Sequence, residues 1–315
     1  MKNLDFEKPI LDLNEKIEQL KELSKEGNID LTEEIKKIEK RAAKLKTEIY
    51  SNLSPIQIIK IARHIDRPDT TSLINLIFEN FIELHGDRLY GDDPAIVGGV
   101  AMLGKTRVVV MGHQKGHTTK ENIHRNFGMP NPEGYRKALR LMNLADKFNM
   151  PVITFIDTPG AYPGIEAEER GQAEAIARNL KEMSGLQVPV ISFIIGEGGS
   201  GGALGLGVAN KVYMLEYSIY SVISPEGCAS ILFRDATKAN IAAQNLKITA
   251  KDIIGLGVAD DAIKEPIGGA HNNWGETAAN IKKKIVADIS ILSRLTGEKL
   301  AENRYKKFRQ MGKFQ

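Results

Sequence analysis

Residues 188–202 read VPVISFIIGEGGSGG, and residues 151–164 read PVITFIDTPGAYPG. Each stretch opens with a continuous apolar run and closes in a loop rich in glycine. Continuous apolar runs are typical of strands in a sheet that helices cover on both faces. The surrounding sequence alternates between strand-like and helix-like patterns. We therefore predict an α/β fold in which these two runs are core strands.

The first 69 residues follow a different pattern. Apolar residues recur every three or four positions in two runs, Ile10–Leu20 and Leu31–Ile49, which predicts two amphipathic helices. Gly27 is placed to end the first helix, and Asp30 is placed to cap the second. We predict an N-terminal helical hairpin arm over residues 1–69 and an α/β domain with C-terminal helices over residues 70–315. The arm either packs on its own body or makes an oligomer contact, and the pattern leaves both open.

Composition excludes several classes of protein. Lys and Arg number 43 against 40 Asp and Glu, a balance too even to indicate nucleic-acid binding. The single cysteine, Cys228, excludes a disulfide framework or a cysteine-rich zinc site in this chain, and the six histidines lack metal-ligand spacing. The sequence starts without a secretion signal, and no apolar run approaches the ~20 residues of a membrane span. We expect a cytoplasmic protein without a metal site.

A P-loop pattern occurs in the wrong setting. Residues 99–106, GVAMLGKT, match the expression G-x4-G-K-[ST]. A phosphate cradle needs a flexible loop between a strand and a helix N-terminus. Here the interior is apolar and the sequence continues as RVVV, so we predict a hairpin turn between strands Ala95–Leu103 and Arg107–Gly112. Before these strands we predict a helix near Leu73–Leu84.

The loop Gly196–Gly202 matches two enzyme motifs. Gly196–Gly201 fits GxGxxG, and Glu216 stands where a ribose-binding acid would. Only about ten residues precede the next strand, which is short for the helix of a dinucleotide-binding unit. Gly198–Gly202 also fits the nucleophile elbow GxSxG around Ser200, with further triad candidates at Asp260, Asp261 and His271. An NAD-dependent dehydrogenase and a serine hydrolase therefore stay open as alternatives.

A third interpretation takes both glycine loops together. Parallel strands place Asp157–Gly164 and Gly196–Gly202 at the same edge of the sheet, outside which ligands bind. Glycine allows backbone N–H groups to approach a ligand closely. Two such loops would make a pair of donors for a developing oxyanion, without any side-chain acid or base. The alternative is that the glycines only form tight turns, but the pairing of two loops favours the donor site.

Longer motifs extend the comparison over nearly the whole chain. The chain resembles the alpha subunits of bacterial acetyl-CoA carboxyltransferases, which belong to the crotonase superfamily. The resemblance rests on ARHIDRP (62–68), ELHGDR (83–88), GHQKG (112–116), NFGMP (126–130), PEGYRKALRLM (132–142), DTPGAYPG (157–164), GEGGSGGA (196–203), SPEGCASIL (224–232) and PIGGAH (266–271).

This resemblance implies a crotonase-like ββα-superhelix core and a defined reaction. Carboxybiotin, held on a separate biotin carboxyl carrier protein, would release CO2 and leave a ureido anion. That anion would take a proton from the methyl group of acetyl-CoA, and the enolate would capture CO2 to give malonyl-CoA, the first step of fatty-acid biosynthesis. The expected partners are a beta subunit with a zinc ribbon, in an alpha2beta2 heterotetramer, and biotin carboxylase in the full complex. This chain would be inactive alone.

The resemblance also implies site residues. The oxyanion donors fall on Gly201 or Gly202 and on Gly160 or Ala161. Glu226 lies near the position of a catalytic acid of the hydratases, and we expect it to serve in packing or capping instead. The residues expected to line the carboxybiotin side of the pocket are Gly199, Ser200, Tyr162, His113, Gln114, Lys115, Asn126 and Phe127.

Overall fold

The two apolar runs form neighbouring parallel strands, as predicted. β4 (Val152–Thr158) pairs with β5 (Val190–Gly199), and every residue of β4 is buried. The computed structural model describes residues 4–27 and 30–312. The outermost residues of the two predicted domains, 1–3 and 313–315, and residues 28–29 of the arm lie outside that description.

The sheet contains eight strands in the described residues, in the order β1-β2-β3-β4-β5-β6-β8, with β7 paired to β5. Pairing is antiparallel from β1 to β3 and parallel from β3 onward. The carboxyl ends of β3, β4, β5 and β6 therefore share one edge. The remaining strands are β1 (Glu79–Glu83), β2 (Ile96–Leu103), β3 (Thr106–His113), β6 (Lys211–Leu215), β7 (Ile219–Ser221) and β8 (Asp261–Ile263).

Two predictions about the first strands have opposite outcomes. The P-loop match is a hairpin turn, because Leu103 pairs with Thr106 and Gly104 has a φ of 58°. The predicted helix over Leu73–Leu84 is wrong in its second half. α4 ends at Ile77, and β1 follows because it pairs with β2, for example Ile82 with Val100.

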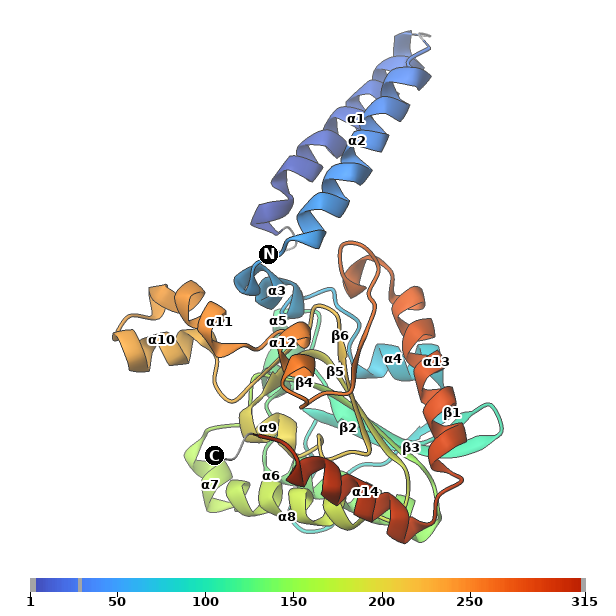
Figure 1. The fold of residues 1–315 in the computed structure, drawn as a ribbon, viewed down its shortest axis with the longest axis vertical. Helices are drawn as coiled ribbons and strands as arrows, with labels where there is room; N and C mark the ends of the chain where they lie inside the picture. The colour runs from blue at the N-terminus through green and yellow to red at the C-terminus, as the bar shows by residue number, and fades with distance from the viewer. Residues whose placement is uncertain (1–3, 28–29, 313–315) are drawn as a thin grey trace.

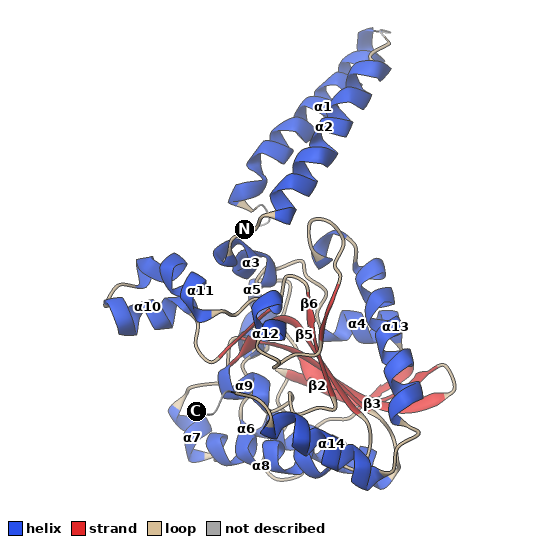
Figure 2. Cartoon of the chain, viewed as in Figure 1, coloured by secondary structure: helices blue, strands red, loops and turns tan. Residues whose placement is uncertain are grey.

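Helices cover both faces of the sheet (Figure 2). Leu73 of α4 and Ile281 of α13 belong to the core on one face. Leu141 of α6 and Met183 of α8 belong to the core on the other. The α-helices of the body are α3 (Pro55–Ala62), α4 (Thr70–Ile77), α5 (Thr119–His124), α6 (Pro132–Lys147), α7 (Ile165–Glu169), α8 (Gln172–Gly185), α9 (Ser200–Leu204), α10 (Pro225–Phe233), α11 (Ala239–Leu246), α12 (Ala250–Gly255), α13 (Trp274–Leu292) and α14 (Gly297–Arg309). Short 3-10 turns span Asp5–Glu7, Asn126–Gly128, Ala236–Lys238 and Ala270–Asn272.

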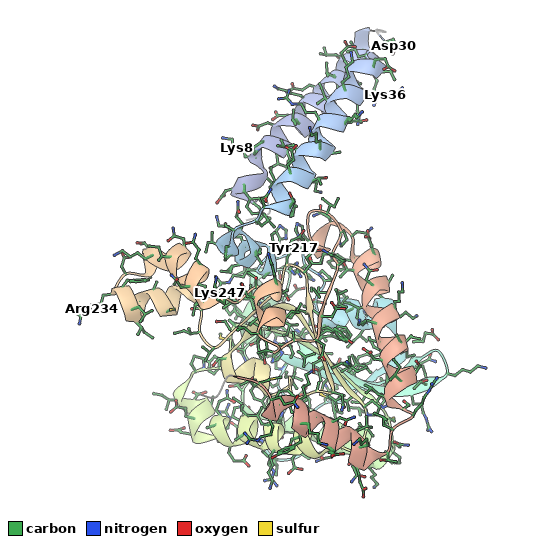
Figure 3. All side chains as sticks on the ribbon, in the orientation of Figure 1. Lys8, Asp30, Lys36, Tyr217, Arg234 and Lys247 are labelled. Carbon is green, nitrogen blue, oxygen red and sulfur yellow. The ribbon has the colours of Figure 1, made fainter. Side chains whose placement is uncertain are left out.

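The predicted hairpin arm projects from the body as two long helices, α1 (Lys8–Gly27) and α2 (Thr32–Ser51), lined with polar side chains (Figures 1 and 3). At its base the Tyr50 hydroxyl donates to Glu7 Oε1 at 2.7 Å, and the ring packs edge-on against Tyr217. The arm is thus anchored through its base. Among the described helices, none is both long and apolar enough to cross a bilayer.

Candidate functional site

The two glycine loops touch at the carboxyl ends of β4 and β5. A Cβ added to Gly199 would lie 2.1 Å from the Pro159 carbonyl oxygen. A Cβ added to Gly202 would lie 2.5 Å from the Ala161 nitrogen. Real Cβ atoms do not approach other atoms so closely, so both positions need glycine for more than a tight turn. The structure therefore brings residues 159–161 and 199–202 together.

The backbone N–H groups of these two loops differ in whether they already have a hydrogen-bond acceptor. Thr158 Oγ1 accepts a hydrogen bond from Gly160 N at 3.1 Å and donates to the Gly160 carbonyl at 2.7 Å. Ala161 N has no hydrogen-bond partner among the described residues. Gly201 and Gly202 lie in the first turn of α9, where N–H groups have no acceptor within the helix. The available donors are therefore Ala161 on one loop and Gly201 and Gly202 on the other.

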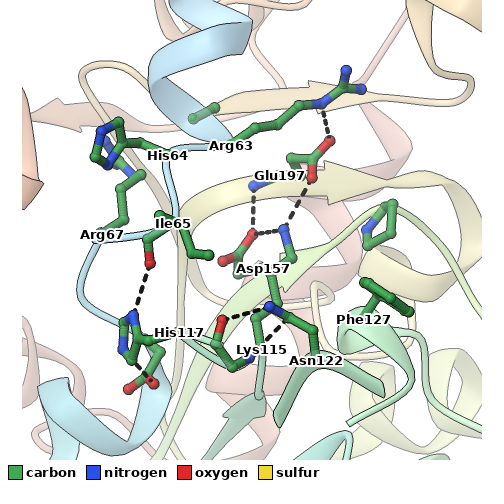
Figure 4. Close-up of a pocket in the computed structure, with 14 residues that line it drawn as sticks. Arg63, His64, Ile65, Arg67, Lys115, His117, Asn122, Phe127, Asp157 and Glu197 are labelled. Atoms are coloured by element: carbon green, nitrogen blue, oxygen red, sulfur yellow. Dashed lines mark hydrogen bonds and ion pairs between the residues drawn. The ribbon is translucent and has the colours of Figure 1, made fainter. Parts of the chain in front are cut away.

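A charge network around the buried carboxylates of Asp157 and Glu197 connects the strands below these loops (Figure 4). Lys115, which follows β3, donates from Nζ to Asp157 Oδ1 of β4 at 2.7 Å and to Glu197 Oε2 of β5 at 2.9 Å. Asp157 Oδ1 also accepts from the Glu197 backbone N–H at 2.9 Å. Arg63, at the C-terminal end of α3, extends the network to Glu197 Oε1 and Glu226 Oε1, each at 2.7 Å. The network holds three strand ends and one helix in register.

The network fixes the charge of its members. Burial alone would raise the pKa of Glu197, but Lys115 and Arg63 lower it to about 2. Burial opposes the charge on Lys115, yet Asp157 and Glu197 raise the pKa of its ammonium group above the ordinary value. At neutral pH Lys115 and Glu197 are ionised and paired, so neither is a free acid or base.

A cavity of about 450 Å³ opens beside the network. Its wall includes His117, whose Nε2 lies 3.0 Å from Asp69 Oδ2 and whose Nδ1 donates to the Ile65 carbonyl at 2.7 Å. The hydrogen bond with Asp69 raises the pKa of His117 to about 9. The full lining is Ala62, Arg63, His64, Ile65, Arg67, Asp69, Lys115, Gly116, His117, Asn122, Phe127, Asp157, Pro159 and Glu197.

The predicted pocket side chains divide into those at the cavity and those held elsewhere. Lys115 and the half-exposed Phe127 line the cavity. Gln114 is engaged in structure, because its amide donates to Asp69 Oδ2 and accepts from Thr71 N. His113 is fully buried, and burial lowers its pKa to about 3, although the backbone of Gly202 and of Phe155 acts in the opposite direction.

The remaining predicted residues act through the backbone. Tyr162 N donates to the Pro130 carbonyl and Gln172 donates to the Tyr162 carbonyl, which ties the first loop to α8. Asn126 has a φ of 47° in a left-handed turn. Ser200 has a φ of 50° and begins α9 without a side-chain cap bond.

The positions of the predicted triad residues argue against a serine hydrolase. His271 stacks on His64, with ring centroids 3.9 Å apart. Asp260 accepts from Val212 N at the amino end of β6, whereas Ser200 follows the carboxyl end of β5. Asp261 pairs with Lys284. The three members of the proposed triad are therefore dispersed over the fold.

The helix that follows the glycine loop is too short for an NAD-dependent dehydrogenase. α9 has five residues, too few for the crossover helix of a dinucleotide-binding unit. Glu216 is held by Lys264 at 2.5 Å and by the Glu265 N–H. A ribose hydroxyl would have to displace both partners.

Sequence reasoning missed Arg63, His117 and Glu197 as site residues. A usable signal existed for one of them, since Glu197 interrupts an apolar run at its carboxyl end, as Asp157 does. Arg63 comes from a segment 134 positions away from Glu197, and no local pattern links the two.

Comparisons with known proteins agree with one another. The family described as acetyl co-enzyme A carboxylase carboxyltransferase-like matches residues 3–312. Three relatives carry the name acetyl-coenzyme A carboxylase carboxyl transferase subunit alpha. The protein of Geobacter metallireducens is 57% identical, covering 99% of this chain and 98% of the relative. That of Geobacillus kaustophilus is 58% identical, covering 98% and 95%. That of Listeria monocytogenes is 56% identical, covering 98% and 97%.

Solved structures with a similar fold are more distant in sequence. Transcarboxylase 12S has a TM-score of 0.59 at 22% identity, over 72% of this chain and 42% of the other. The beta subunit of Pseudomonas aeruginosa geranyl-CoA carboxylase has a TM-score of 0.57 at 14% identity, over 78% and 46%. A Pseudomonas malonate decarboxylase hetero-tetramer has a TM-score of 0.56 at 16% identity, over 68% and 86%. These likenesses concern the fold, and they confirm the predicted crotonase-like class.

Proposed function

The chain belongs to the family of acetyl-CoA carboxylase carboxyltransferase alpha subunits, and from that premise we propose how its two glycine loops promote carboxyl transfer. The family membership makes the chain a component of a carboxyl-transferring enzyme. The serine hydrolase and the dehydrogenase are not supported by the relatives. What needs an explanation is how a site without a free acid or base contributes to the reaction.

The ureido oxygen of biotin is the group that the loops stabilise. When the N–CO2 bond of carboxybiotin breaks, CO2 leaves and negative charge spreads over the ureido nitrogen and oxygen. N–H groups of Ala161 and of Gly201 or Gly202 donate to that oxygen. The anion then takes a proton from the methyl group of acetyl-CoA, and the enolate carbon bonds CO2 to give malonyl-CoA. One preorganised donor of this kind contributes roughly 2.7–4 kcal/mol to transition-state stabilisation.

The observation that carries this proposal is the contact between the two loops. Gly199 and Gly202 approach residues 159–161 closely enough that a methyl group would not fit. Of the two candidates on the first loop, Ala161 is the better donor, because Thr158 already accepts from Gly160. Such an approach serves donors that must point at one atom.

The charge network positions the loops. Asp157 accepts from both Lys115 Nζ and Glu197 N, so the strand ends that carry the loops cannot shift independently. The ammonium group of Lys115 is already paired with two carboxylates, so we assign Lys115 a positioning role beside the cavity. Phe127 at the cavity wall offers an apolar face for the biotin rings. The other predicted pocket residues shape the loops and take no part in carboxyl transfer. They are Ser200, Tyr162, His113, Gln114 and Asn126.

The partners follow from the family. Relatives named as alpha subunits imply a multi-subunit enzyme with a beta subunit. We infer that the beta subunit carries a zinc ribbon and joins this chain in an alpha2beta2 heterotetramer that supplies the acetyl-CoA side of each site. Biotin arrives on its carrier protein after biotin carboxylase has loaded it, in the cytoplasm.

Reconstitution tests the assignment. The chain is co-expressed with a beta subunit, and malonyl-CoA-dependent carboxylation of biocytin is measured, with each chain alone as a control. We expect activity only from the pair. Ser200→Ala should retain most of it, because its hydroxyl has no chemical role. Full activity of this chain alone, or loss of all activity in Ser200→Ala with the fold intact, would refute the proposal.

A further inference from the structure

A second cavity, of about 660 Å³, lies between the loop of residues 86–91, α6 and α8. It shares no lining residue with the cavity beside the charge network. In Figure 2, α6 and α8 lie together at the lower side of the body. The lining residues are Asp87, Arg88, Leu89, Arg136, Leu139, Arg140, Asn143, Glu174, Ala175, Arg178 and Glu182. A volume of this order suits a small-molecule ligand.

The loop at its edge is held in a fixed shape. Asp87 Oδ1 accepts from the N–H groups of Leu89, Tyr90 and Gly91, and Oδ2 accepts from Arg136 Nε at 2.8 Å. Burial would raise the pKa of Asp87, but these bonds hold it below its ordinary value. The loop places Arg88 at a φ of 67°, in the left-handed region that side chains other than glycine seldom adopt. Such strain persists only where the surroundings impose it.

That strained conformation brings two like charges together. Arg88 Nη1 and Arg140 Nη2 both donate to the carbonyl oxygen of His85, at 3.0 and 3.1 Å. Arg140 Nε donates to the Gly86 carbonyl. None of the ion pairs found in the described part of the chain involves either guanidinium group. Burial, and after it the charge of Arg88, lowers the pKa of Arg140, whereas the carboxylates of Asp92 and Asp87 act in the opposite direction. A bound anion would reduce the repulsion between these two cations beside the open cavity.

The other charges of the cavity leave this pair dominant. Arg136 is neutralised by Asp87 and Glu133, and Arg178 pairs with Glu174 at 3.4 Å. Among the described residues that line the cavity, Glu182 is the carboxylate without an ion pair. Its negative charge partly offsets the positive charge of the two guanidinium groups. Asn143 offers a neutral amide, and the exposed Leu89 offers an apolar surface.

We propose that Arg88 and Arg140 form a binding site for the phosphate groups of a small phosphorylated ligand, a diphosphate fitting two adjacent guanidinium forks. Each planar guanidinium can donate two parallel hydrogen bonds to phosphate oxygens. Leu89 and Leu139 supply apolar surface for the rest of the ligand. The site is independent of the carboxyl-transfer loops, so it stands or falls separately from the proposed function.

Calorimetric titration of the full chain with inorganic pyrophosphate tests this site. We expect one saturable site whose affinity weakens as salt is raised. Arg88→Ala and Arg140→Ala should each weaken binding about tenfold or more, the scale of a lost charged hydrogen bond. Glu182→Gln should tighten binding, because it removes the opposing carboxylate. ADP binding more tightly than pyrophosphate would identify a nucleotide as the ligand, and equal affinity a free diphosphate.

Arg178→Ala is the matched control, since its guanidinium borders the same cavity but is paired with Glu174. It should change the affinity far less than Arg88→Ala. Thermal melts must show that each variant is folded, and Arg88, being exposed, is the safer variant. Absence of pyrophosphate binding, or equal affinity in the wild type and Arg88→Ala, would overturn the proposal. It would also be overturned if the arginine variants weakened only the association with the beta subunit, which would make the occupant an acidic protein segment.

Discussion

Single glycines decide whether the two loops can meet. At Gly202 an added Cβ would lie 2.5 Å from Ala161 N, whereas at Gly201 the nearest atom would be 3.8 Å away. Gly202→Ala should therefore force the loops apart and lower kcat by about 10²-fold, the effect of losing one donor. Gly201→Ala should change kcat little. Steady-state kinetics of the two variants with the beta subunit check this, and similar losses in both would contradict it.

Charges in the network should couple energetically. Lys115→Met leaves Asp157 and Glu197 without their shared cation, and we expect it to destabilise the fold by roughly 2–4 kcal/mol, less than for a fully dry pair. Asp157→Asn keeps the shape but weakens the hold on both loops, so kcat should fall. The double variant should lose less stability than the sum of the two single variants. Urea denaturation of all three measures the coupling, and strict additivity would refute the network.

The interaction of His117 with Asp69 makes the stability of the folded state change with pH in the alkaline range. Its pKa is raised from 6.5 to about 9 by Asp69. The proton is held more tightly in the folded state, so the stabilisation is fully present below about pH 6.5 and lost as pH rises through 9. The stability difference between the wild type and His117→Gln should shrink over this window, as thermal melts would show. An unchanged difference from pH 6.5 to 9.5 would contradict the ion pair with Asp69.

Whole elements depend on contacts that differ in range. β4 and β5 could be predicted because VITFI and VISFII are apolar except for Thr154 and Ser192, and a continuous run of this kind is typical of a core strand. β1 could not, because its ENFIE sequence is mostly exposed and forms a strand only by pairing with β2. The loops of the site were predictable from glycine spacing. Arg63 and Lys115 were harder to place, since their partners are 134 and 82 positions away along the chain.

The buried guanidinium of Arg304 anchors helix α14 to the body. Arg304 donates to the carbonyls of Met183, Leu186 and Val188, and to Asn210 Oδ1. Arg304→Leu would leave these acceptors buried and without a donor, at a cost of about 3 kcal/mol or more. Lys306→Ala on the same helix should cost less than about 0.5 kcal/mol, because Lys306 is exposed. Denaturant midpoints compare the two, and equal losses would argue against this anchor.

At the scale of the molecule, the chain is a body, with a sheet edge at which we propose that carboxybiotin binds, and an arm anchored at its base (Figure 1). Carboxyl transfer as proposed needs the body and a partner, whereas the arm consists of two long helices with mostly polar surfaces. The proposed site follows from the sheet, in which parallel strands bring glycine loops from distant parts of the sequence to the same place.

Carboxyl transfer as we propose it depends on a backbone N–H group of the second loop that stabilises the biotin oxyanion. The most direct test compares Gly201→Pro with Gly201→Ala in the reconstituted enzyme, because the substitutions differ in the N–H group and the alanine Cβ has room. We predict that kcat for malonyl-CoA-dependent biocytin carboxylation falls 10²-fold or more, by order of magnitude, in the proline variant alone. A folded Gly201→Pro enzyme with the kcat of Gly201→Ala would contradict stabilisation of the oxyanion by the Gly201 N–H group.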